Sequence, residues 1–193
     1  MRIPTCLWSG FAALATILPL CAQTVSSPAG PAAPLISAAE TRPAPADFLL
    51  RQQAAQHALE LGLPSVAAAI DRELLALPGV DHGALTLALA TALLDDGRVG
   101  EAEQALQGMA AAERGAAWHL RTGLIDIVEK KTDAAKAEAA SVKPEQLGAT
   151  DRGWFYFLQG RLADAAGDGP RAQALYEQAA AAAVSDQQRA QFA

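Results

Sequence analysis

The side chains that could carry out chemistry are few and widely separated. The three histidines, His57, His82 and His119, are 25 and 37 residues apart, so no two of them have the i, i+4 spacing of a His-Glu-x-x-His zinc site. The chain contains neither a Gly-x-Ser-x-Gly nucleophile elbow nor a Walker-type phosphate loop. The acidic pair Asp95–Asp96 precedes a glycine at an expected turn, where carboxylates are common. We therefore expect no enzyme activity, no cofactor and no bound metal.

A stripe of aromatic and charged side chains is the clearest candidate for a binding surface. Residues 154–157 are four consecutive aromatic residues, and one face of a helix cannot bury all of them. If Tyr156 packs against a neighbouring helix, a second stripe with a spacing of three or four residues points elsewhere. It consists of Trp154, Phe157, Arg161 and Asp164. Tryptophan and arginine are frequent anchors in interfaces, so this stripe predicts binding of a partner.

The elements that would position these residues are helices with short breaks between them. Asp47 can cap a helix over residues 48–61. A Gly-Leu-Pro-Ser turn follows, in which Ser65 can cap a second helix over residues 66–77 before Pro78-Gly79 ends it. The pattern predicts two antiparallel helices joined by a tight turn.

Small residues show that this helix pair recurs. In the first helices they are separated by 35, 33 and 37 residues, at Ala55, Ala90, Gly123 and Gly160. In the second helices the separations are identical, at Ala67, Ala102, Ala135 and Ala172. Two helices approach closely only where side chains are small, and an internal repeat of this length indicates a helical solenoid. Seven residues further along each second helix stand apolar residues, Leu74, Met109, Val142 and Ala179, which should pack on the following unit.

The repeated pattern resembles the tetratricopeptide repeat. In the fourth unit the resemblance lies in Tyr156 to Gly160, Ala163, Gly167-Asp168, Ala172, Tyr176 and Ala179. In the second it lies in Leu89-Ala90, Leu93, Gly97-Arg98, Ala102, Leu106 and Met109, and in the first in Ala54-Ala55, Ala58, Gly62, Ala67 and Leu74. Three positions depart from the pattern: Asp71, Asp126 and, in place of a turn glycine, Lys130.

The resemblance implies an all-α superhelix of about four helix-turn-helix repeats with a concave groove that binds a peptide segment. The expected units are 47–80, 81–114, 115–149 and 150–184. The groove would be lined by Leu120, Leu124, Trp154, Phe157, Arg161 and Asp164. Two alternatives remain open at this point. The chain could form a helical bundle without repeats, or neighbouring helices could cover the stripe.

The flanking segments predict export. A basic start at Arg2 and an apolar run that ends near Ala22 are typical of a signal peptide over residues 1–22. Both cysteines lie in this segment, and lipidation of Cys21 is a less favoured alternative because bulky Leu20 precedes it. Residues 23–46 contain five prolines and predict a disordered linker. Residues 185–193 resemble the start of a further helix that the chain leaves incomplete, which predicts a poor cap for the repeats.

Charge and composition narrow the class of partner. The formal net charge of −6 disfavours nucleic acid. Hydrophobic residues are 51% of the chain but aromatic residues only 5%, which suits helices packed through alanine. We expect an exported scaffold that binds a partner protein in the periplasm or cell envelope. The alternatives are a self-assembling structural subunit, or the repeat module of a longer protein whose distinctive function lies downstream.

Overall fold

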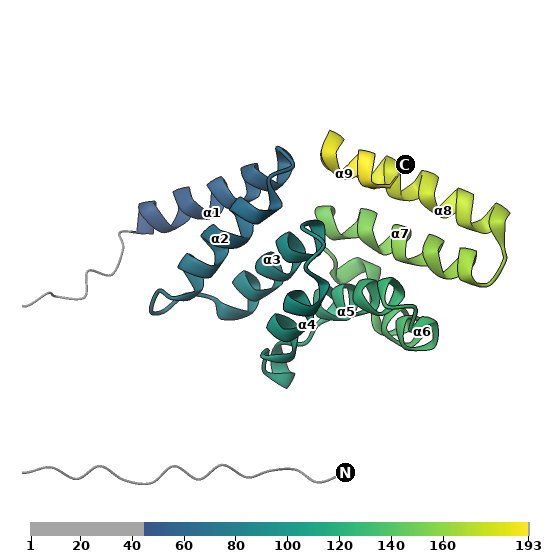
Figure 1. Ribbon diagram of the computed structural model, residues 1–193, viewed down its shortest axis with the longest axis horizontal. Coiled ribbons are helices and arrows are strands. Elements are labelled where there is room, and N and C mark those ends of the chain that lie inside the picture. Colours follow the sequence, from purple (N-terminus) through teal and green to yellow (C-terminus); the bar gives the residue numbers. More distant parts are fainter. Residues whose placement is uncertain (1–44, 193) are drawn as a thin grey trace, which may run out of the picture. The chain divides into compact units, whose positions relative to one another are not determined.

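The computed structural model describes residues 45–192, and all regular secondary structure among them is helical (Figure 1). The expected signal peptide at 1–22 and nearly all of the expected linker at 23–46 lie outside the described residues. The nine α-helices of the described part are α1 (Pro45–Glu60), α2 (Pro64–Leu75), α3 (His82–Asp95), α4 (Val99–Gln107), α5 (Ala116–Val128), α6 (Thr132–Ser141), α7 (Ala149–Ala165), α8 (Gly169–Ala182) and α9 (Asp186–Gln191). None of these helices is both long and apolar enough to span a membrane.

Two helix starts differ from the expected positions, and proline explains both. Helix α1 begins at Pro45, so Asp47 lies in its first turn and is not its cap. Helix α2 begins at Pro64, which moves the cap position to Leu63, where no side chain bonds the helix end, and leaves Ser65 inside the helix. Proline is favourable in the first turn because its missing N–H would have had no partner there.

The turns inside the four helix pairs share one backbone conformation. Gly62, Gly97 and Gly167 have φ angles of 70°, 74° and 77°, in the left-handed region that glycine adopts without steric cost. Lys130 occupies the equivalent turn between α5 and α6 with a φ angle of 63°. The third unit therefore makes the same turn without glycine.

The small residues in register are buried where the helices of each pair meet. All eight of them are buried, and the four apolar residues that follow seven positions later are buried too. Both glycines are close to a neighbouring helix. A Cβ atom on Gly160 would lie 2.6 Å from Tyr176 Cε1 of its partner helix α8, and one on Gly123 would lie 3.3 Å from Glu138 Cβ of its partner helix α6 and 2.9 Å from Leu158 Cδ2 of α7. No side chain fits at these contacts without displacing a neighbour.

Two hydrophobic clusters form the core and meet at α5. The first contains mainly alanines and leucines of α1 to α4, together with Ile125. The second contains Leu120, Leu124 and Leu158, with Trp154 and Phe157 packed against it. Because Leu124 and Ile125 are adjacent on α5, this helix connects the alanine-rich part of the core to the aromatic part.

Helix α9 lies in the segment where the sequence indicated the start of a further helix. It follows α8, packs against it and also contacts α1 (Figure 1). Ser185 caps it by accepting a hydrogen bond from the backbone N–H of Gln188 at 3.1 Å. Gln188 and Phe192 are both buried. The segment that the sequence indicated as a poor cap is therefore docked on the other helices.

Candidate functional site

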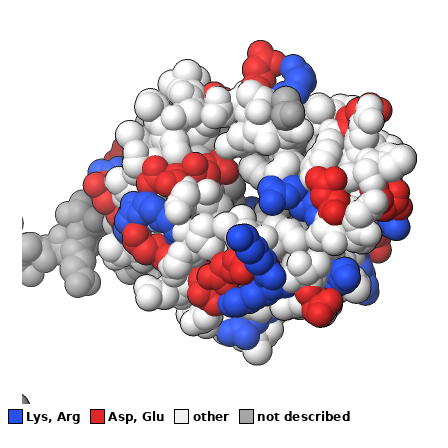
Figure 2. Space-filling view, turned by 45° about the vertical axis from the view of Figure 1, so that its right-hand side comes forward, with Lys and Arg blue, Asp and Glu red and all other residues white. Residues whose placement is uncertain are grey.

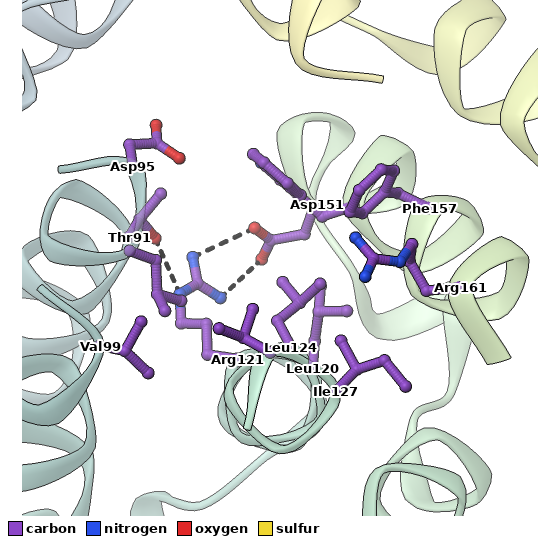
Figure 3. Close-up of a pocket in the computed structure, with 13 residues that line it drawn as sticks. Thr91, Asp95, Val99, Leu120, Arg121, Leu124, Ile127, Asp151, Phe157 and Arg161 are labelled. Atoms are coloured by element: carbon purple, nitrogen blue, oxygen red, sulfur yellow. Dashed lines mark hydrogen bonds and ion pairs between the residues drawn. The ribbon is translucent and has the colours of Figure 1, made fainter. Parts of the chain in front are cut away.

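A cavity of about 110 Å³ lies between α3, α5 and α7. Its α3–α5 wall is mainly apolar and includes the polar residues Thr91, Asp95 and Arg121. The apolar residues of this wall are Leu94, Val99, Leu120, Leu124, Ile127 and Val128, where Val99 comes from the start of α4. Its α7 wall carries Trp154, Phe157 and Arg161. We call this cavity and its two walls the groove (Figure 3).

The register of the repeat explains why these side chains converge. In α5, Gly123 faces α6, since a Cβ atom there would lie 3.6 Å from the carbonyl oxygen of Ala135. Leu120, Leu124 and Ile127 follow one another at intervals of three to four residues, so they share a face of α5. That face is offset from Gly123 and forms the floor of the groove.

Arg121 ties the three inner helices together beneath the groove (Figure 3). Its Nε donates to the carbonyl oxygen of Leu87 at 3.0 Å and to Thr91 Oγ1 at 2.8 Å. Its Nη1 donates to the carbonyl oxygen of Ala117 at 2.9 Å, and its Nη1 and Nη2 reach the two carboxylate oxygens of Asp151 at 3.3 and 3.1 Å. Arg121 is only 9% exposed, and this set of acceptors compensates the loss of its hydration.

Asp95, at the end of α3, lies on the edge of the groove close to both Arg121 and α9. Burial raises the pKa of the Asp95 carboxyl to about 6, while the side-chain amide of Gln191 and the charge of Arg121 act in the opposite direction. Asp95 also lines a second depression together with Gln191 of α9.

Aromatic rings form the other end of the groove. The ring of Trp154 is perpendicular to that of Phe157, with centroids 5.7 Å apart. Phe192 of the α9 segment stacks on Phe157 at 5.4 Å and meets Trp154 edge to face at 4.9 Å. The guanidinium of Arg161 lies 5.9 Å from the centre of the Phe157 ring, within reach of a cation–π interaction.

Five of the six residues that the sequence indicated for the groove line this one cavity: Leu120, Leu124, Trp154, Phe157 and Arg161. Asp164 does not. Its carboxylate accepts a hydrogen bond of 2.6 Å from the hydroxyl of Tyr176 on α8, and it lines a neighbouring depression together with Phe157 and Arg161. Burial and this carboxylate raise the pKa of Tyr176 to about 12.

Sequence reasoning missed Arg121, Asp151 and Phe192. Arg121 and Asp151 are 30 residues apart on the first helices of successive units, so an opposite-charge pair at similar levels of two neighbouring helices could have suggested the contact. Phe192 is the only large apolar residue after Val184, which was a signal that this segment docks.

Two histidines outside the groove lie beside carboxylates. His119 Nδ1 lies 2.7 Å from Glu138 on α6, and His57 Nδ1 lies 3.4 Å from Glu60. In the part of the chain that the structure describes, no three His, Cys, Asp or Glu side chains are grouped closely enough to hold a metal ion. The groove itself presents an apolar floor, aromatic rings and the guanidinium of Arg161 at its edge.

Comparisons with known proteins identified no relative. No family model matches this sequence, and neither the curated proteins nor the solved structures gave a significant match.

Proposed function

We propose that this chain is an exported scaffold of the tetratricopeptide type that binds a segment of a partner protein in the groove. The repeat assignment is supported by a common register. The positive-φ turn positions 62, 97, 130 and 167 are separated by 35, 33 and 37 residues, as are the buried small residues of both helices. Four helix pairs thus repeat one local geometry, with length differences confined to the connections between pairs.

The observation that carries the binding function is the apolar cavity on the inner side of α3, α5 and α7. A concave, mainly apolar surface with a few polar groups at its edge is the usual form of a binding site. Here Arg161 provides an exposed cation and Trp154 and Phe157 provide half-buried rings. These are the residue types that dominate binding energy in interfaces.

The size of the cavity favours a protein segment over a small molecule. Sites that enclose a small organic ligand have volumes of about 300–1,000 Å³, whereas this cavity measures about 110 Å³. That volume accommodates one or two side chains. A peptide segment that lies along the inner helices and inserts an apolar side chain fits the dimensions.

The charge distribution agrees with a protein partner. Acidic and basic residues are interspersed among uncharged areas on the face shown in Figure 2, and the formal net charge is −6. Nucleic acid would require a continuous basic surface. We place the scaffold in the periplasm or cell envelope because of the signal-like residues 1–22.

Photo-crosslinking from a residue that lines the groove tests whether the groove binds a partner protein. Val128 and Val66 are both exposed, at 55% and 46%, but only Val128 lines the groove. With p-benzoylphenylalanine at position 128, we expect a discrete adduct with one envelope protein, and none with the matched substitution at position 66. Equal labelling from both positions would contradict a binding groove, and an adduct between two copies of the chain would favour self-assembly.

A further inference from the structure

Helix α9 is held in place mainly by two buried side chains, those of Gln188 and of Phe192, which follows the helix directly. Four of its six residues, Asp186, Gln187, Arg189 and Ala190, are exposed. Gln188 Nε2 donates to the carbonyl oxygen of Thr150 at 2.8 Å, and its Oε1 accepts from the backbone N–H of Val184 at 2.9 Å. The second anchor is Phe192, four residues later.

The anchor Phe192 uses the aromatic wall of the groove. Its ring packs against Trp154 and Phe157, the two aromatic residues that also line the cavity. The backbone at Gly153 allows this approach, since a Cβ atom there would lie 2.8 Å from Phe192 Cε2. Phe192 therefore lies against the same two rings that line the cavity.

The way α9 docks differs from the contacts within the helix pairs. The pairs meet through buried alanines and glycines at fixed offsets, whereas α9 contributes a glutamine and a phenylalanine. A helix of six residues has little stability of its own, so α9 depends on these two contacts. Segments held by few buried contacts open without global unfolding.

Release of α9 would extend the groove. Helix α9 lies along a second depression that is lined by Leu59 and Glu60 of α1, Asp95 of α3 and Trp154 of α7. Asp95 and Trp154 also line the cavity between α3, α5 and α7. The two depressions are therefore adjacent, and α9 covers the region that connects α7 to α1.

We propose that α9 is an internal ligand of the groove, and that the groove recognises a short helical segment with glutamine at position i and phenylalanine at i+4. This inference rests on the proposed binding function and specifies its partner: a protein segment that presents an amide and an aromatic ring one helical turn apart. Such a segment competes with Gln188 and Phe192 for Thr150, Trp154 and Phe157. Occupation by α9 lowers the apparent affinity of the groove for the partner, because only the open fraction of the chain binds.

The probe is a fluorescein-labelled synthetic peptide with the sequence of residues 184–192. We expect the full chain with Phe192→Ala to bind this peptide at least about tenfold more tightly than the unmodified chain in an anisotropy titration, because the internal competitor is weakened. The matched control, Arg189→Ala, alters an exposed α9 residue that pairs with Asp186 and should behave like the unmodified chain. A peptide with alanine in place of its phenylalanine should not bind.

Failure of the peptide to bind the folded Phe192→Ala chain would overturn the inference, and so would loss of the fold in that variant. Hydrogen exchange on the unmodified chain gives a second test that needs no substitution. We expect the amides of α9 to exchange faster than those of α7 and α8; exchange of all three only through global unfolding would show that α9 is a permanent part of the fold.

The crosslink from position 128 separates this inference from the proposed function. A partner adduct whose yield rises with Phe192→Ala supports both. An adduct with unchanged yield leaves the binding function intact and rejects competition by α9. Peptide binding without any partner adduct supports the internal contact and rejects the proposed function.

Discussion

The two walls of the groove are built on different principles. The α3–α5 wall is fixed by Arg121, which bonds the backbone of two helices, a threonine hydroxyl and the Asp151 carboxylate of α7. The α7–α9 wall is held by contacts between rings, with Arg161 exposed at its edge. Directional hydrogen bonds to a buried cation allow one arrangement, whereas rings that meet edge to face tolerate replacement of one ring by another. The first wall therefore sets the geometry of the groove, whereas on the second wall one ring can replace another, as the proposed competition between α9 and a partner requires.

The largest effect should come from the fixed wall. Arg121→Met removes the cation and leaves Asp151, whose side chain is 16% exposed, without its partner. Breaking a buried ion pair from one side costs about 3 kcal/mol or more, so the midpoint of urea unfolding should fall strongly. Arg161→Met, at the exposed edge, should change stability by less than about 0.5 kcal/mol. Similar losses for both variants would remove the distinction between the walls.

A substitution at Gly160 tests the close packing of α7, which carries the aromatic wall, against α8. A Cβ atom there would lie 2.6 Å from the ring of Tyr176, whereas one on Gly100 of α4 has no neighbour within 4 Å. Gly160→Ala should destabilise the fold by about 2 kcal/mol through overpacking. Gly100→Ala is a matched control and should be neutral or slightly stabilising because alanine favours helix. Thermal unfolding followed by circular dichroism measures both, and equal melting temperatures would contradict the assigned register.

The free energy of unfolding should depend on pH because the carboxyls of Asp71 and Asp95 are largely buried. Burial raises the pKa of Asp71 to about 6, and Asp95 reaches a similar value. Between pH 4 and 6 the native state then binds more protons than the unfolded chain, so the free energy of unfolding falls as pH rises through this window. We expect Asp71 alone to make the protein about 1 kcal/mol more stable at pH 5 than at pH 7.

The control for this pH dependence is Asp71→Asn, which should flatten the change measured by urea unfolding. An unchanged slope in this variant would show that other groups cause it.

The smallest change in stability is expected at the turn between α5 and α6. Lys130 adopts a φ angle of 63°, a conformation that costs non-glycine residues roughly 1 kcal/mol. Lys130→Gly should therefore raise stability by somewhat less than about 1 kcal/mol, since glycine also loses more entropy on folding. The reverse change, Gly97→Lys, should lower it by a similar amount. Denaturant midpoints that move in the opposite directions would contradict the shared turn geometry.

The repeated helix pairs could be predicted from the sequence because they depend on residues close together in the chain. Proline and glycine mark helix ends, and alanines or glycines at equal offsets mark where two helices touch, so the helix pairs and their buried small residues could be predicted. Trp154, Phe157 and Arg161 were predicted from helical periodicity, and Leu120 and Leu124 from the resemblance to the repeat family. These five residues line one cavity. The tetratricopeptide assignment itself stays a prediction.

Only the tertiary structure decided the contacts between residues that are distant in the chain. The partners of Arg121 lie up to 34 residues away, and Gln188 bonds Thr150 across 38 residues. Asp164 accepts a hydrogen bond from Tyr176, and this contact depends on the packing of α7 against α8. Periodicity specifies which face of a helix a residue occupies, but the group that it meets there depends on the relative placement of whole helices, and that placement is set by the packing of the entire core.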